Sequence, residues 1–252
     1  MPPGKKPTGS SDLPAINIPE TNIEREPHTR ASLQEAANEK RVSRITKEFS
    51  DGLSFINKYQ RSVTIYGSAR FLSENVHYKD ARALAYKLSK RGYAIITGGG
   101  PGIMEAGNRG AMDAEGDSIG LNIELPHEQI INPYVTDSLS FYYFFARKTT
   151  MSYSAEAYIF FPGGFGTLDE FFEIITLIQT KKMHRVPIVL VGSDFWDPLK
   201  DFLEKTMLQV HGTIAKKDLH LFAIIDDKDE IIEHIEENQF HEVCEINPKE
   251  NL

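Results

Sequence analysis

The chain has 252 residues, of which 40% are hydrophobic and 25% are charged, as in a globular protein with a sizeable core. Its formal net charge of −8 argues against broad electrostatic binding to nucleic acid or to an anionic membrane, although a helix N-terminus can still bind a small anion. The single cysteine, Cys244, excludes an intrachain disulfide. We expect a cytoplasmic protein, because no signal-type hydrophobic stretch and no membrane-length apolar run is present.

The first 60 residues differ in pattern from the rest of the chain. Residues 1–31 are rich in Pro, Ser, Thr, Lys and Glu and lack periodicity, so we predict a disordered or extended arm. Residues 32–60 carry apolar side chains at helical spacing and are predicted to form an amphipathic helix. This helix packs either on its own domain or at a subunit interface. Residues 61–237 are predicted to form one Rossmann-like domain, and residues 238–252 a polar tail.

Short apolar strands alternate with amphipathic helices after residue 61. We predict strands at 62–67, 93–97, 118–123, 157–161, 187–191 and 219–225. We predict helices at 79–91, 103–113, 145–155, 168–180, 194–210 and 228–237. This alternation is typical of βαβ units, whose crossovers bury a parallel sheet between two helical layers. The predicted fold is therefore α/β, with a single doubly wound, mainly parallel sheet and helices on both faces.

Two glycine-rich turns each follow a predicted strand and open a helix. The first, Thr97–Gly102, contains Gly98, Gly99 and Gly100, and the second, Pro162–Thr167, contains Gly163, Gly164 and Gly166. Glycine lets a ligand approach the backbone closely, and the helix that follows presents free N–H groups and its positive dipole end. We therefore expect a phosphate group at these turns, the alternative being that each turn is merely tight.

The spacing of these glycines disfavours two common nucleotide-binding motifs. Neither turn has glycine at the first, third and sixth positions of the dinucleotide fingerprint, and neither ends in the Gly-Lys-Ser/Thr of a P-loop. A mononucleotide or sugar phosphate is therefore favoured over NAD or over ATP hydrolysis. We expect no cofactor and no metal, because the chain has no cysteine pair and no His-x-x-x-His pair.

Two acids follow the second glycine-rich turn. Asp169 is interpreted as an ordinary partner of the helix dipole. Glu170 lies three residues beyond Thr167, which matches a capping box and gives it a structural alternative. A carboxylate beside a phosphate-binding turn could instead stabilise the oxocarbenium-like transition state of glycoside cleavage.

Two basic residues precede the fourth predicted strand. Arg147 and Lys148 are the only charged residues in the aromatic and apolar segment 141–151. They are interpreted either as a clamp on phosphate or ribose or as solvated residues at a helix start. Arginine suits the first role because its planar fork donates two hydrogen bonds at once.

These blocks together resemble the LOG (Lonely Guy) family, also labelled lysine-decarboxylase-like. The PGGxGTxxE signature of that family is matched by Pro162–Glu170. Gly98–Met104 (GGGPGIM) resembles a second family block, GGGxxGxM, with one residue fewer between the glycines. Arg147 and Lys148 match an Arg-Lys pair on the helix before the signature strand. The resemblance covers roughly residues 62–225, and the long N-terminal part resembles the longer bacterial-type members.

The resemblance implies that the chain hydrolyses the N-glycosidic bond of a nucleoside 5′-monophosphate, AMP or a cytokinin riboside 5′-monophosphate, to free base and ribose 5-phosphate. It implies Arg147 and Glu170 as the catalytic pair. It also implies a homodimer or larger homo-oligomer. The substrate-binding residues that it implies are Gly67, Ser68, Gly99, Gly100, Glu105, Asn122, Lys148, Gly163, Gly164, Gly166 and Thr167.

Two other functions compete with this one. A non-catalytic nucleotide-binding protein or molybdenum-cofactor carrier of the same fold would use the glycine-rich turns without chemistry. A nucleotide-dependent oxidoreductase is disfavoured by the failed fingerprints. Lysine decarboxylation normally uses pyridoxal phosphate, for which the sequence contains no motif.

Overall fold

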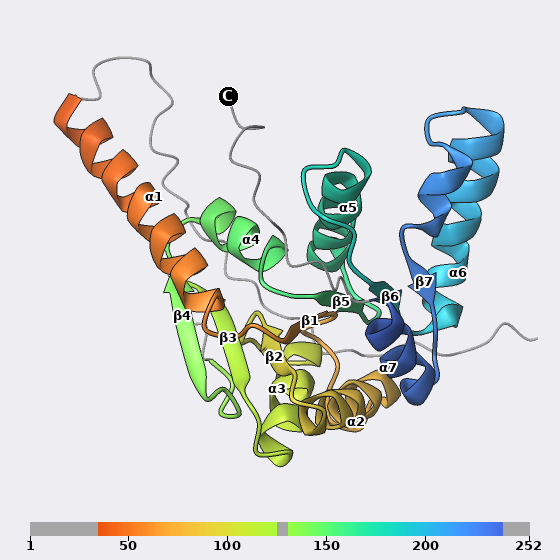
Figure 1. Ribbon diagram of the computed structural model, residues 1–252, viewed down its shortest axis with the longest axis horizontal. Helices are drawn as coiled ribbons and strands as arrows, with labels where there is room; N and C mark the ends of the chain where they lie inside the picture. The colour runs from red at the N-terminus through yellow and green to blue at the C-terminus, as the bar shows by residue number, and fades with distance from the viewer. Residues whose placement is uncertain (1–34, 125–130, 239–252) are drawn as a thin grey trace, which may run out of the picture.

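Seven parallel strands form one sheet in the order β4-β3-β2-β1-β5-β6-β7 (Figure 1). The computed structural model describes residues 35–124 and 131–238, so the predicted arm and nearly all of the predicted tail lie outside the described residues. The strands are β1 (Ser62–Tyr66), β2 (Ala94–Thr97), β3 (Ser118–Ile123), β4 (Asp137–Phe141), β5 (Ala157–Phe160), β6 (Ile188–Leu190) and β7 (Ala223–Ile224). Every pairing between neighbours is parallel.

Helices cover both faces of the sheet (Figure 1). One face carries α2 (Val76–Lys90), α3 (Ile103–Asp113) and α7 (Lys228–Glu237). The other face carries α1 (Glu35–Ile56), α4 (Phe144–Ser152), α5 (Phe165–Gln179) and α6 (Ser193–Asp201). The alternation of side chains along β1 divides the core accordingly, because Val63 and Ile65 join the first cluster and Tyr66 joins the second. The predicted doubly wound α/β fold is confirmed.

The strand order reverses between β1 and β5. From β1 the chain adds β2, β3 and β4 toward one edge of the sheet, and it then returns to add β5, β6 and β7 on the other side of β1. The carboxyl ends of β1 and β5 therefore flank the topological switch point, where doubly wound folds bind their ligands.

Four parts of the chain differ from the prediction. The edge strand β4 was not predicted, because its side chains alternate in exposure and do not form a continuous apolar run. Helix α5 begins at Phe165, three residues before its predicted start. The predicted strand 219–225 is reduced to Ala223–Ile224, since Lys216–His220 forms a 3₁₀ helix. Beyond α6, which contains Pro198, the predicted continuous helix becomes π-helical over Phe202–Val210.

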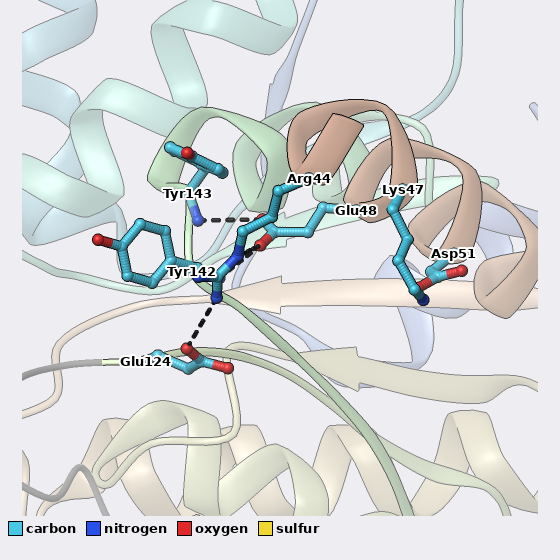
Figure 2. A network of polar contacts seen from close by, with 7 residues as sticks. All are labelled: Arg44, Lys47, Glu48, Asp51, Glu124, Tyr142 and Tyr143. Atoms are coloured by element: carbon cyan, nitrogen blue, oxygen red, sulfur yellow. Dashed lines mark hydrogen bonds and ion pairs between the residues drawn. The ribbon is translucent and has the colours of Figure 1, made fainter. Parts of the chain in front are cut away.

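A single carboxylate joins α1 to the start of α4. Glu48 accepts hydrogen bonds from the backbone N–H groups of Tyr142 at 3.3 Å and Tyr143 at 3.0 Å (Figure 2). Tyr143 is the N-cap of α4 and makes no side-chain capping bond of its own. Arg44 also donates to Glu48, at 3.2 Å, and its guanidinium lies 3.8 Å from the centre of the Tyr142 ring. Helix α1 thus packs on its own domain and fixes the beginning of α4.

We expect Glu48→Ala to lower the free energy of unfolding by about 1–2 kcal/mol, because two N–H groups at the start of α4 would lose their acceptor. Lys47→Ala is the matched control, since it removes only the exposed ion pair with Asp51 seen in Figure 2 and should change stability by less than about 0.5 kcal/mol. Urea denaturation of both variants measures the difference. Equal losses would show that Glu48 does not anchor α4.

Candidate active site

A cavity of about 810 Å³ lies at the switch point between β1 and β5. The ends of these strands and the first turns of α3, α4 and α5 contribute to its wall. Eight of the site residues predicted from the sequence border this cavity: Gly67, Ser68, Arg147, Gly163, Gly164, Gly166, Thr167 and Glu170. Segments distant in the sequence are therefore brought to one place by the topology of the sheet.

The start of α5 presents unpaired backbone donors to the cavity. Gly164 is the N-cap of α5 and makes no side-chain capping bond. The first bond of the helix runs from the Leu168 N–H to the Gly164 carbonyl, at 3.1 Å. The N–H groups of Phe165, Gly166 and Thr167 precede that bond and have no acceptor within the helix. Together with the helix dipole they form a site suited to an anion.

The position of Thr167 removes the capping alternative for Glu170. Because α5 begins at Phe165, both Thr167 and Glu170 lie inside the helix, and neither side chain caps it. The possible capping box and the possible capping role of Thr167 were wrong, since only Gly163 and Gly164 form the turn. A Cβ atom at Gly163 would overlap the Thr167 hydroxyl, so a glycine is needed there for Thr167 to pack beneath the turn.

Glu170 is a buried carboxyl group with one unpartnered oxygen. Its side chain is only 6% exposed, and its Oε2 atom has no hydrogen-bond partner among the described residues. Burial raises the pKa of Glu170 to about 7, because desolvation disfavours the ionised form. Lys148 and Arg147 oppose this shift, and Glu173 adds to it. Near neutral pH this carboxyl can therefore hold or release a proton.

The Arg147 side chain extends from α4 to β3 and borders the cavity. Its Nε atom donates to the Leu121 carbonyl at 2.7 Å. Gly98 makes room for the guanidinium, because a Cβ atom there would overlap Nη2 of Arg147 and lie 2.7 Å from the Met104 sulfur. Burial lowers the pKa of Arg147, while Tyr66 and the Glu170 charge oppose that shift. The cavity is thus bordered by a partly buried cation and a buried acid.

The first glycine-rich turn is held by bonds within the protein. The Asn132 backbone N–H donates to the Gly99 carbonyl at 2.8 Å, and the Asn132 side chain donates to the Gly100 carbonyl at 3.0 Å. The Gly99 N–H donates to the Thr97 hydroxyl at 3.0 Å. Within the described structure, Gly99 and Gly100 do not border the cavity, whereas Gly98 does.

Comparison with known proteins places the chain in a family. Residues 104–235, more than half of the chain, match the family model described as "Possible lysine decarboxylase". The chain belongs to this family. The cytokinin riboside 5′-monophosphate phosphoribohydrolase LOG of Oryza sativa subsp. japonica is 29% identical over 186 residues, which cover 72% of this chain and 74% of the rice protein. The cytokinin riboside 5′-monophosphate phosphoribohydrolase LOG2 of Arabidopsis thaliana is 27% identical over 150 residues, which cover 58% of this chain and 70% of the Arabidopsis protein. The resemblance to the LOG family is confirmed.

Solved structures share the fold of this family member. The molybdenum cofactor carrier protein of Chlamydomonas reinhardtii matches with a TM-score of 0.52 and 21% identity, over 70% of this chain and 96% of that one. The molybdenum cofactor binding protein of Rippkaea orientalis matches with a TM-score of 0.51 and 21% identity, over 70% and 94%. These matches support the Rossmann-like architecture.

Lys148, which the LOG resemblance implied as a substrate-binding residue, faces α5 and does not border the cavity of the described structure. Its ammonium group pairs with Asp169 at 2.5 Å and with Glu173 at 3.0 Å. These pairs tie α4 to α5, and the Lys148 charge lowers the pKa of Glu170. The position of Lys148 therefore favours a positioning role over direct contact with a ligand.

Two further residues implied by the LOG resemblance lie away from the cavity in the described structure. Glu105 accepts a hydrogen bond from the Tyr78 hydroxyl at 2.7 Å, between α2 and α3. Asn122 is buried on β3, where alternation places its side chain on the face opposite that of Leu121, which packs with residues of α4 and α5.

Several residues of the cavity were not predicted from the sequence. Arg70 and Met104 follow β1 and β2, and Tyr66 is the last residue of β1. Phe144 and Phe165 are exposed aromatic residues at the first positions of α4 and α5. The end of a strand before a glycine is the only signal that could have indicated Tyr66.

Among the described residues, no helix has the length and apolar character needed to span a bilayer.

The raised pKa of Glu170 predicts a pH-dependent difference in stability between the wild type and Glu170→Gln. A raised carboxyl pKa stabilises the folded state fully below the unfolded value of 4.5, and this contribution is lost as the pH rises through about 7. Relative to the glutamine variant, the wild type should lose about 2 kcal/mol of unfolding free energy between pH 5.5 and pH 8.5.

Urea denaturation across this pH range measures that difference. Glu233→Gln is the control, since Glu233 is exposed on α7 and its substitution should give the same small difference at both pH values. A flat profile for Glu170→Gln would show that the carboxyl is not desolvated.

Proposed function

We propose that the chain hydrolyses the N-glycosidic bond of a nucleoside 5′-monophosphate and releases free base and ribose 5-phosphate. The observation that carries this proposal is the unpartnered, buried carboxyl of Glu170 beside the uncapped N-terminus of α5 in one cavity. The activity for which the LOG relatives are named supports the same reaction class.

The start of α5 is suited to the 5′-phosphate. Three N–H groups and the positive end of the helix dipole face a group that carries close to two negative charges. Arg70 and Arg147 are the cations that border the cavity, and they offset the charges of Asp169 and Glu170 there. The charged side chains at the cavity therefore balance one another, so a dianion is less strongly repelled there than the overall net charge of −8 suggests.

Glu170 supplies the electrostatic part of the reaction. As the bond from the anomeric carbon to the base nitrogen breaks, its electron pair leaves with the base and positive charge develops on the sugar. An ionised carboxylate in a water-poor site stabilises that charge. The oxygen of a water molecule then bonds to the anomeric carbon, one proton passes to the base nitrogen, and the other remains on the new hydroxyl. Arg147 holds the nucleotide in place and favours the ionised form of Glu170.

We further propose AMP or a cytokinin riboside 5′-monophosphate as the substrate. The names of the plant relatives favour the second. The apolar side chains of Met104, Phe144 and Met151 border the cavity near Arg147 and suit a flat or prenylated base.

We expect the enzyme to release free base from at least one of AMP, GMP, CMP, UMP and N6-isopentenyladenosine 5′-monophosphate, as measured by chromatography. Glu170→Ala and Arg147→Ala should each lower kcat/KM by about 100-fold or more, because each removes a charge placed for the transition state. Glu233→Gln should retain wild-type activity. Activity should rise with pH through about 7, as Glu170 ionises.

Two outcomes would contradict this account. Absence of base release from every nucleotide, together with nucleotide binding, would favour a non-catalytic carrier. Base release that survives Glu170→Ala would remove Glu170 from the catalytic role while leaving the reaction in place.

We propose a homodimer formed through the aromatic surface around α4. This surface consists of Tyr142, Phe144, Phe145 and Tyr153, each about half exposed, which is unusual for large apolar side chains gathered on and beside one short helix. We expect light scattering to give twice the chain mass of 28.5 kDa.

Phe145→Asp should shift the protein toward the monomer, whereas Val210→Asp, at an exposed position of the π-helical segment, should not. A monomeric wild type, or a dimer indifferent to Phe145→Asp, would contradict this interface.

A further inference from the structure

Tyr66 ends β1 at the floor of the cavity. Its side chain is 7% exposed, and its ring stacks on Phe160 of the neighbouring strand β5 with centroids 4.9 Å apart. The ring therefore belongs to the core beneath α4 and α5. Tyr66 also borders the cavity that contains Glu170.

The hydroxyl group of Tyr66 has no hydrogen-bond partner among the described residues. A buried, unpartnered hydroxyl costs free energy unless a ligand or water satisfies it. Tyr158 on β5 is a close comparison, because it is also buried and its ring lies 6.5 Å from that of Tyr66. The Tyr158 hydroxyl, however, donates to the Ser152 carbonyl at 2.5 Å. Of these two neighbouring tyrosines, the one at the cavity is unsatisfied.

The surroundings keep this hydroxyl protonated. Burial and the nearby Glu170 charge raise the pKa of Tyr66 well above its ordinary value, although Arg147 opposes the shift. At neutral pH the phenol therefore carries its hydrogen and can donate it. The unpartnered Oε2 atom of Glu170 is an acceptor at the same cavity.

A donor and an acceptor that belong to residues of one cavity match the chemistry of a sugar hydroxyl. Such a hydroxyl accepts a hydrogen bond at its oxygen and donates its own hydrogen. Glu170 lies little more than one turn along α5 from the N–H groups proposed to bind the phosphate, about the distance at which the ribose of a bound nucleotide would follow its 5′-phosphate.

We propose that the Tyr66 hydroxyl donates a hydrogen bond to a ribose hydroxyl held by Glu170, and that it thereby selects ribonucleotides over nucleotides whose sugar lacks that hydroxyl. This inference rests on the proposed function, in that the ligand is taken to be a nucleoside 5′-monophosphate.

The test compares Tyr66→Phe with the wild type in the binding of AMP, 2′-deoxy-AMP and 3′-deoxy-AMP. Calorimetry at low temperature, within the time before free base appears in a parallel sample, gives the three dissociation constants. The substitution should weaken AMP binding about fivefold to tenfold, as expected for one neutral hydrogen bond. It should leave the binding of at least one of the two deoxynucleotides unchanged within twofold, because that ligand lacks the hydroxyl that Tyr66 contacts.

Equal weakening of all three nucleotides, or unchanged binding of AMP, would overturn the proposal. Binding is measured without turnover, so a protein that binds AMP but never releases base would contradict the proposed hydrolysis and still test Tyr66.

Tyr158→Phe is the matched control. It removes the hydroxyl that donates to the Ser152 carbonyl, so it should reduce stability and leave the ratio of AMP to deoxynucleotide binding unchanged. Tyr66→Phe should leave the free energy of unfolding unchanged or raised, because no protein partner is lost. A stability loss for Tyr66→Phe as large as that for Tyr158→Phe would indicate a structural role and contradict the proposal.

Discussion

The desolvation of Glu170 and Arg147 at one cavity is the constraint on which the site depends. An acid buried between α5 and the sheet would ordinarily be neutral, and a partly buried guanidinium loses favourable hydration. Each moderates the cost of the other at a point where the strand order reverses. The carboxyl ends of β1 and β5 leave space there, so the fold itself provides an opening in which these groups meet a ligand.

The two glycine-rich turns, alike in the sequence, have different physical tasks. In the first turn Asn132 donates hydrogen bonds to the carbonyl groups of Gly99 and Gly100. Gly98 has no side chain, which leaves room for Arg147. In the second turn Gly164 begins α5 without a cap, so the helix amides stay available. One turn therefore makes room for a cation, and the other leaves the first amides of α5 without an acceptor in the helix.

The fold followed from local patterns, whereas the site followed only in part. Alternating apolar strands and amphipathic helices predict a parallel sheet, because burial on both faces requires that pattern, but the half-exposed edge strand β4 lacks it. Glu170 and Arg147 were found through a motif. Lys148 was placed at the ligand through the family resemblance, together with Arg147, whereas helical geometry turns its side chain toward Asp169 and Glu173. The contact from Asn132 to the first turn spans about thirty residues and has no local signal.

Two pairs of like side chains differ in whether their polar atoms find partners among the described residues. Glu48 and Glu170 are both shielded carboxylates on helices, but Glu48 accepts two backbone bonds and holds α4 in place, whereas one oxygen of Glu170 accepts none from the described residues. Tyr158 and Tyr66 repeat this contrast on neighbouring strands. Folding favours the satisfied member of each pair, so the unsatisfied member is retained at a cost in stability that ligand binding can offset. Because Glu170 and Tyr66 border one cavity, a ligand bound there could supply the hydrogen bonds that both side chains lack.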